Sequence, residues 1–206
     1  MKYTKGGPML KEQRFTAKNG SEIVIRPANP DDSCAILNTV RSNAIERSYV
    51  LMEQYGKNDD AEKEYISGLD PKGSLMIVAA SEGVAVGCLA ALQADAGMRP
   101  ETRHILHVGL HLSEPFRGQG IGHRLLEYAI EWAVANGFKK LEANIFTTNR
   151  RSLSLFSKAG FMEEGVRKNS IRIGSNFVNE VLMGKVLQPQ AGSGSEEHDA
   201  SRRGAA

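Results

Sequence analysis

Hydrophobic and polar positions along the chain follow two different periods, and their alternation predicts a mixed α/β domain. Segments that are apolar at every second position, or apolar throughout, are typical of strands. They cover residues 23–26, 74–80, 84–92, 104–112, 140–146, 166–169 and 177–183. Apolar positions three and four residues apart are typical of helices that bury one face. They cover residues 35–40, 61–68, 125–134 and 149–159. The order of these segments predicts a sheet flanked by helices, with no internal repeat.

Turn residues between these segments predict three hairpins. Asn19-Gly20 follows the short apolar segment 15–17, and Ser81-Glu82-Gly83 separates two strand-like runs. Gly174-Ser175 separates the last two runs of the chain. Such pairs of residues favour the tight turns that join antiparallel strands.

The composition is that of an ordinary globular protein with one core. The chain has 206 residues, of which 41% are hydrophobic and 24% are charged. Its formal net charge is +2, and the basic residues are interspersed with acidic ones, which argues against a nucleic-acid surface. No apolar run approaches the roughly 20 residues of a membrane span, and the N-terminus shows no apolar signal-peptide region. We therefore expect a cytoplasmic protein that binds neither nucleic acid nor membranes.

The two ends of the chain are expected to lie outside the folded domain. After Leu187 the sequence contains no large apolar residue, so it cannot repay the entropy of ordering. The first residues include Gly6-Gly7-Pro8, which also disfavours regular structure. These features predict a flexible segment over residues 1–14, one domain over 15–187 and a disordered tail over 188–206.

A glycine-rich turn carries the clearest chemical signal. Arg117-Gly118-Gln119-Gly120-Ile121-Gly122 stands between an apolar strand and an amphipathic helix. This arrangement aims free backbone N–H groups and the positive end of a helix dipole at one point, which suits a phosphate. The spacing lacks the Gly-Lys-Ser/Thr of the Walker motif and the later third glycine of the dinucleotide fingerprint. Nucleotide hydrolysis and hydride transfer are therefore disfavoured.

A second motif follows about thirty residues later, where residues 149–161 read Asn-Arg-Arg-Ser-Leu-Ser-Leu-Phe-Ser-Lys-Ala-Gly-Phe. Together the two motifs resemble the signatures of the GNAT superfamily of acyl-CoA-dependent N-acyltransferases. Two ordered motifs, with a helix and a strand between them, are more specific than either one alone. The resemblance implies the GNAT fold, a mostly antiparallel central sheet flanked by helices, in which the acyl-CoA strand splays away from its parallel neighbour.

The resemblance also implies acetyl-CoA as the cosubstrate. Coenzyme A carries a pyrophosphate, which the backbone N–H groups of the glycine turn can hold without side-chain selectivity. Positions matching Leu110 and Leu112 offer backbone groups to the pantetheine arm. Asn149 bonds the amides of the coenzyme, caps its helix, or does both. The expected cofactor residues are Leu110, Leu112, Arg117, Gly118, Gln119, Gly120, Ile121, Gly122, Asn149, Ser152, Phe156 and Lys158.

One departure from the family pattern concerns the proton donor for the leaving thiolate. Many members have a tyrosine where this chain has Phe156, which either packs against the pantetheine arm or faces the core. The thiolate then takes its proton from water or from another group, such as Ser154 or Ser157. A thiol with a reference pKa near ~8.5 is acidic enough that transfer does not require the missing donor. Lys158 either meets the ribose phosphate or lies on a solvated helix face.

The general base is sought on the strand before the glycine turn, where GNAT enzymes often place it. That strand carries His104, His107 and His111, and Glu114 follows it. The expected catalytic residues are His111, Glu114 and His104. Strand alternation puts His107 and His111 on one face and His104 on the other, so these three histidines cannot act together. Strand residues four apart are separated by roughly 13 Å, which is too far to share an ion, so no metal site is expected.

The predicted function is an N-acetyltransferase that moves the acetyl group of acetyl-CoA to a primary amine of a small molecule, by direct transfer. Amino acids, polyamines and antibiotic-like amines are the candidate acceptors. Two alternatives remain open: a protein N-terminal or lysine acetyltransferase, and a non-catalytic acyl-CoA sensor. Residues 43–68 and 174–180 are expected to line the acceptor site, without a motif of single meaning. The sheet edge formed by the last strands can support a homodimer.

Overall fold

The computed structural model describes residues 11–45 and 58–188, which fold into eight strands and four α-helices. The strands are β1 (Gln13–Thr16), β2 (Glu22–Pro27), β3 (Ser74–Ser81), β4 (Val84–Gln93), β5 (Ile105–Leu112), β6 (Lys140–Phe146), β7 (Met162–Ile173) and β8 (Asn176–Val186). The helices are α1 (Ser33–Ile45), α2 (Asp59–Gly68), α3 (Ile121–Ala135) and α4 (Arg150–Lys158). This is the mixed α/β composition that the sequence predicts.

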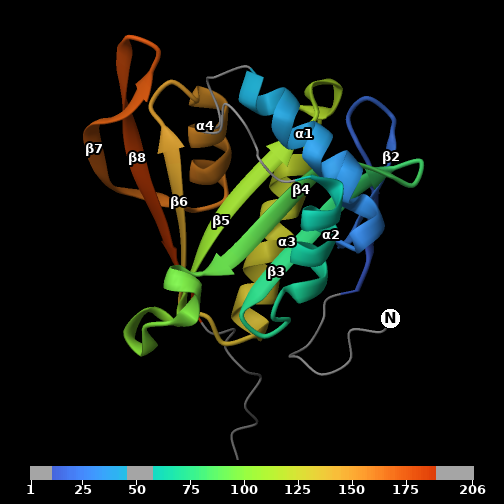
Figure 1. Ribbon diagram of the computed structural model, residues 1–206, viewed down its shortest axis with the longest axis horizontal. Helices are drawn as coiled ribbons and strands as arrows, with labels where there is room; N and C mark the ends of the chain where they lie inside the picture. Colours follow the sequence, from blue (N-terminus) through green and yellow to red (C-terminus); the bar gives the residue numbers. More distant parts are fainter. Residues whose placement is uncertain (1–10, 46–57, 189–206) are drawn as a thin grey trace, which may run out of the picture.

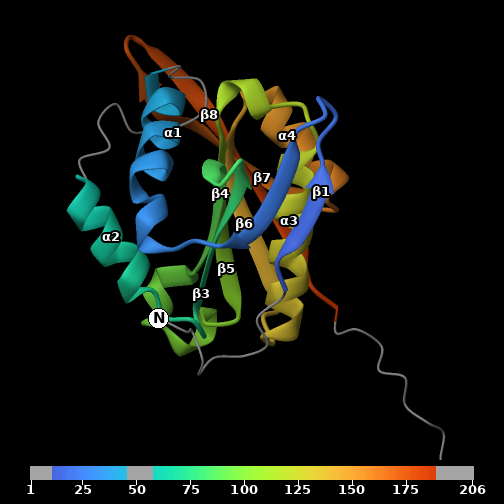
Figure 2. The same cartoon turned by 90° about the vertical axis from the view of Figure 1, so that its right-hand side faces the viewer.

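The elements form three layers, with one sheet between two layers of helices. The strand order is β1-β2-β3-β4-β5-β6-β8-β7. Helices α1 and α2 cover one face of the sheet, and α3 and α4 cover the other (Figures 1 and 2). Each strand from β1 to β4 pairs antiparallel with the next one along the chain, so the first five strands form an antiparallel run.

The sheet splays between β5 and β6, its parallel pair. Their register covers three residue pairs, from Ile105 with Lys140 to His107 with Glu142, although β5 continues to Leu112 and β6 to Phe146. Beyond Glu142, β6 keeps its antiparallel pairing with β8 on its other side. Figure 1 shows the two strands diverging from this point. The splayed GNAT sheet expected from the resemblance is confirmed.

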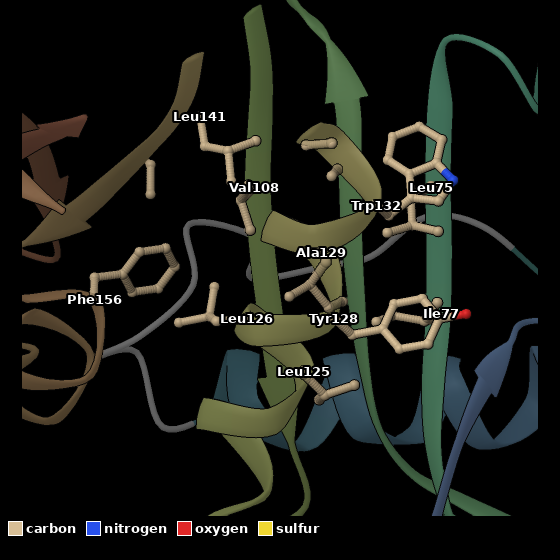
Figure 3. Packing of buried hydrophobic residues seen from close by; sticks show 14 of the residues in the cluster. Leu75, Ile77, Val108, Leu125, Leu126, Tyr128, Ala129, Trp132, Leu141 and Phe156 are labelled. Carbon is tan, nitrogen blue, oxygen red and sulfur yellow. The ribbon is translucent and has the colours of Figure 1, made fainter. Parts of the chain in front are cut away.

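The main core lies between the sheet and α3. Side chains of α3 that recur at helical spacing, Leu125, Leu126, Ala129 and Trp132 among them, pack on apolar residues of the strands (Figure 3). The Trp132 ring also stacks on Phe138, with 5.6 Å between ring centroids. A smaller cluster, which includes Ile36, Ile66 and Cys88, lies under α1 and α2. The amphipathic α3 therefore supports the strands from the face opposite α1.

The N-terminal hairpin is present and begins earlier than expected. Gly20 adopts φ +87° in the turn, and β1 pairs with β2 from Gln13 onward, two residues before the predicted domain boundary. Asn29 caps the short 3-10 helix Pro30–Asp32, which leads into α1. Arg26 donates two hydrogen bonds to Asp32, at 2.7 and 2.8 Å, and so ties the end of β2 to the start of α1.

The last hairpin is longer than predicted. The Gly174-Ser175 turn is confirmed, but β7 covers Met162–Ile173 instead of the short segment 166–169. Most of β7 is exposed, and its register with β8 shifts twice, between Glu163 and Gly165 and between Arg167 and Ile171. A strand that is exposed on both faces needs no alternation of apolar and polar residues. The bulges also shift the side-chain alternation of β7, so the sequence shows only part of this strand.

Several expectations fall wholly or partly outside the described residues. Residues 1–10 and 189–206 belong to the predicted flexible ends, and residues 46–57 belong to the predicted acceptor segment. The limits of the domain therefore stay predictions. In the part of the chain that the structure describes, no helix is both long and apolar enough to cross a lipid bilayer.

The burial of Trp132 gives a test of this packing. Trp132 is 1% exposed, whereas Phe177, in β8, is 61% exposed. We expect Trp132→Ala to lower the free energy of unfolding by about 3–5 kcal/mol, because it removes a buried ring and leaves a cavity. Phe177→Ala should change it by no more than about 0.5 kcal/mol. Urea unfolding of both variants measures the difference, and equal losses would contradict the packing described here.

Candidate active site

The glycine turn, residues 117–122, forms an open anion-binding corner. Gly118 and Gly120 adopt φ +74° and +90°, and a Cβ at either position would meet no atom of residues 11–45 and 58–188 within 4 Å. Gly120 is the N-cap of α3, and the first backbone bond across this cap runs from the Arg124 N–H to the Gly120 carbonyl, at 3.3 Å. The N–H groups of Ile121 and Gly122 precede that bond and point out of the helix end. The positive end of the helix dipole adds to their attraction for an anion.

The neighbouring edge of β5 offers unpaired backbone groups. Ser113 donates its N–H to the Val86 carbonyl on β4, at 2.9 Å. Antiparallel pairing alternates, so the backbone groups of Leu110 and Leu112 point to the other side, toward β6. Pairing with β6 has ended at His107. With respect to the described strands, residues 108–112 therefore form an open edge of β5, which leads directly to the glycine turn.

Gly122 brings the glycine turn into contact with the second motif and with β5. A Cβ on this buried residue would lie 3.0 Å from the Leu155 side chain on α4 and 3.3 Å from the Leu110 side chain. Leu112 lies 3.5 Å from the same point. The absence of a side chain thus lets α3, α4 and the open edge of β5 meet at one place. Leu155 was not among the expected residues.

Arg117 is directed along β5 and toward α1. Its Nε donates to the Leu112 carbonyl at 3.1 Å, and a terminal nitrogen donates to Oδ1 of the buried Asn43. One turn earlier on α1, the Thr39 hydroxyl lies 3.1 Å from the Ser113 hydroxyl. Arg117 thus holds the end of β5 against α1. The contact with the coenzyme that the sequence analysis expects of Arg117 stays a prediction.

Thr39 was not predicted as part of the site, and Asn43 was expected only as the first residue of the acceptor segment 43–68. Both are buried polar residues on α1, four positions apart, so they lie on one face of the helix. Their spacing of four residues was the one feature of the sequence that could have indicated a shared polar face. It becomes informative only when the end of β5 is known to lie beside this helix.

The second motif performs a structural task that its residues explain. Asn149 caps α4, because its Oδ1 accepts the Ser152 N–H at 3.0 Å. Phe156 is 3% exposed and packs edge-on against Phe161, with ring centroids 4.9 Å apart. Of the two alternatives for Phe156, the structure favours the core. Lys158 is exposed in the last turn of α4, at the end opposite Asn149.

The structure does not bring the three expected catalytic residues together. His111 is partly buried on the same face as its β4 neighbour Cys88. Glu114 is exposed in the short 3-10 helix Glu114–Phe116, beyond the end of β5. His104 precedes β5 at its other end, so the seven steps from His104 to His111 span roughly 23 Å. In residues 11–45 and 58–188, no three His, Cys, Asp or Glu side chains lie where they could share a metal ion.

His111 gives a prediction for the pH dependence of stability. Burial lowers its pKa from 6.5 to about 4. The unfolded chain then binds the proton more tightly than the folded one, so stability is lost as pH falls from about 6.5 to about 4. The difference between the two values corresponds to about 3 kcal/mol.

Acidification from pH 7 to pH 4 should lower the free energy of unfolding of both proteins. We expect the decrease in His111→Asn to be smaller than that in the wild type by up to about 3 kcal/mol. Urea unfolding at the two pH values measures this difference. Carboxylates contribute equally to both proteins, so the comparison isolates the imidazole. Equal losses on acidification would show that His111 is not desolvated as described.

Comparison with known proteins identifies the family. The model of the acetyltransferase (GNAT) family matches residues 42–161, more than half of the chain. A candidate phosphinothricin acetyltransferase of Bacillus subtilis (strain 168) is 40% identical over 68 residues, which are 33% of this chain and 42% of that protein. The match thus spans less than half the length of this relative.

Two solved structures share the fold. One is a GNAT superfamily phosphinothricin acetyltransferase from Sinorhizobium meliloti in complex with AcCoA, 22% identical, with a TM-score of 0.73 over 86% of this chain and 95% of that one. The other is the ribosomal-protein-alanine N-acetyltransferase from Brucella melitensis, 25% identical, with a TM-score of 0.71 over 79% and 99%. With its splayed sheet, its glycine turn and a family model that covers more than half of its length, the chain belongs to the acetyltransferase (GNAT) family.

Proposed function

We propose that the protein is an N-acetyltransferase that moves the acetyl group of acetyl-CoA to a primary amine of a small molecule. One observation carries this proposal: the anion-binding glycine turn and the open edge of β5 lie end to end. Coenzyme A has the matching sequence of groups, a pyrophosphate followed by an arm that contains two amides. The AcCoA bound to the Sinorhizobium meliloti protein supports this choice of ligand.

In this proposal the coenzyme is held mainly by backbone groups. The N–H groups from Gly118 to Gly122 bind the pyrophosphate, for which the open space at the two left-handed glycines leaves room. The arm adds to the sheet as a short extra strand, bonded to Leu110 and Leu112. Arg117, Asn149 and Ser152 contribute by fixing the end of β5 and the start of α4.

The acetyl group is transferred directly. The amine nitrogen attacks the thioester carbonyl carbon, the C–S bond breaks, and coenzyme A leaves as a thiolate that becomes a thiol. A backbone N–H on the open edge of β5 is suited to stabilise the negative charge that develops on the carbonyl oxygen. Since Phe156 has no hydroxyl and lies in the core, the thiolate takes its proton from another source.

A small-molecule acceptor is supported by the names of the phosphinothricin acetyltransferase relatives. The described residues also leave the face of the sheet next to the splay uncovered: among them, a Cβ at Gly109 on β5 would meet no atom within 4 Å, and Asn144 on β6 is exposed. The Brucella melitensis relative is named for a protein acceptor, so protein N-termini belong in the same test.

The experiment measures release of free thiol from acetyl-CoA with a panel of amino acids, polyamines, aminoglycosides and N-terminal peptides. Thiol release that depends on a small amine, with formation of its acetamide, is the expected result. Release with peptides alone would replace the proposal by a protein acetyltransferase. Binding of acetyl-CoA without turnover on any amine would favour the sensor.

Two glycines at opposite ends of α3 provide a matched pair of variants. Gly120 and Gly137 have similar left-handed φ values, +90° and +81°, and no atom of the described residues lies within 4 Å of a Cβ at either position. Asp at either position meets the same backbone strain, but only Asp at position 120 puts a carboxylate into the anion-binding corner. We expect Gly120→Asp to weaken acetyl-CoA binding roughly 100-fold, the equivalent of about 3 kcal/mol of lost charge-assisted hydrogen bonding.

Gly137→Asp should bind acetyl-CoA within about twofold of the wild type, because the C-terminal end of α3 lies away from the corner. Titration calorimetry of the two variants measures both affinities. Equal weakening by the two substitutions would mean that strain in α3, rather than the loss of an anion site, explains the effect.

A further inference from the structure

A row of charged and titratable side chains crosses the sheet at the point where β5 and β6 separate. His107 and Glu142 form the last residue pair of the parallel register, and their side chains lie on the same face. Nδ1 of His107 is 3.7 Å from a carboxylate oxygen of Glu142. Lys140 Nζ lies 2.8 Å from Glu142 and 2.8 Å from Glu164 of β7. We call these four residues the polar row.

The polar row is fixed at one end and accessible at the other. Lys140 is held between two carboxylates, and its hydrogen bond to Glu142, followed by that to Glu164, raises its pKa, so it stays charged. Glu164 lies against Gly184 of β8, where a Cβ would collide with its carboxylate. The His107 side chain, by contrast, is 49% exposed, and its neighbour on β4 is the apolar Leu92. The imidazole is thus the member of the row that an acceptor can reach.

The length of the pantetheine arm relates the polar row to the proposed chemistry, and this step rests on the function proposed above. About twelve bonds separate the phosphate from the sulfur, which equals about four residues of extended chain, or about 14 Å. An arm that starts at the glycine turn, level with Leu112, therefore reaches back along β5 to about Val108. The thioester then lies beside His107, at the narrow end of the splay.

We propose that His107 is the general base of the acetyl transfer and that Glu142 is its positioning residue. Glu142 accepts the Nδ1 proton of the imidazole, which leaves Nε2 to accept a proton from the acceptor ammonium. The neutral amine forms the C–N bond, and the C–S bond breaks with its electron pair on sulfur. The second amine proton passes to the thiolate, and His107 releases its proton to solvent.

The other candidate bases are less well placed for this role. His111 lies four residues nearer the glycine turn, beside the pyrophosphate end of the arm, and is partly buried. Glu114 lies beyond the end of β5, and His104 precedes its start. A distance of 3.7 Å between His107 and Glu142 is longer than a hydrogen bond, as is common before a substrate is bound.

The first test replaces the imidazole and adds it back. We expect His107→Ala to lower kcat by roughly 100-fold or more, within the range that general base catalysis contributes, with the KM for acetyl-CoA within about twofold. Added imidazoles should restore turnover, and the restored rate should rise with the basicity of the imidazole used. A residue with a merely structural role would give no such dependence.

The second test asks whether Glu142 acts through His107. Glu142→Gln should lower kcat about tenfold in the wild-type background and should have no further effect in the His107→Ala background. Glu127→Gln is the matched control, because Glu127 also lies beside a histidine, His123, but on α3. It should leave kcat unchanged in both backgrounds.

The outcomes separate this inference from the proposed function. If the wild type turns over an amine and His107→Ala keeps its kcat, the assignment of the base is overturned while the acetyltransferase stands. The same holds if the loss in His107→Ala is not restored by any imidazole. If Glu142→Gln lowers kcat equally in both backgrounds, its role as the positioning residue is overturned. Absence of turnover in the wild type with the whole amine panel would instead overturn the proposed function.

Discussion

The early end of backbone pairing between β5 and β6 is the constraint on which the rest of this structure depends. After His107, each strand keeps one partner and turns its other edge to an unpaired gap. Strand N–H and C=O groups are costly to leave without partners, so a gap of this kind persists only when both strands are held apart. Several contacts described above serve that purpose.

The two strands are held by different parts of the molecule. The end of β5 is fixed by β4 and by α1, through Arg117 with Asn43 and Ser113 with Thr39. Strand β6 is fixed by β8 along its whole length, and its core-facing residues pack with α3 and α4. Gly122 sits where these supports converge, which explains why no side chain is accommodated there. The shape of the gap is therefore a property of the entire sheet.

An element of this fold is visible in the sequence when its signal lies among neighbouring residues. The helix α3 and the strands β3 and β4 bury apolar residues at regular spacing, so their periodicity was visible. The glycine turn and the Asn149 cap are local motifs whose function needs only neighbouring residues. Strand β7 was underestimated because it is exposed on both faces and bulged. The pairing of His107 with Glu142 joins residues far apart in the chain through sheet register, which the sequence does not display. The same is true of Arg117 and Asn43.

The strand order has a consequence for how the site comes into being during synthesis. The hairpins β1-β2 and β3-β4 close short loops, and α1 and α2 connect β2 to β3, so the sheet from β1 to β5 pairs each strand with the one made just before it. Strand β6 obtains its long partner only when β8 has been made, since β8 inserts between β6 and β7. Among the described strands, three register pairs join the two halves of the sheet, and α3 connects the halves and packs on both. The gap proposed as the coenzyme site thus lies between the part of the sheet made first and the part made last, and it is complete only when β8 has been synthesised.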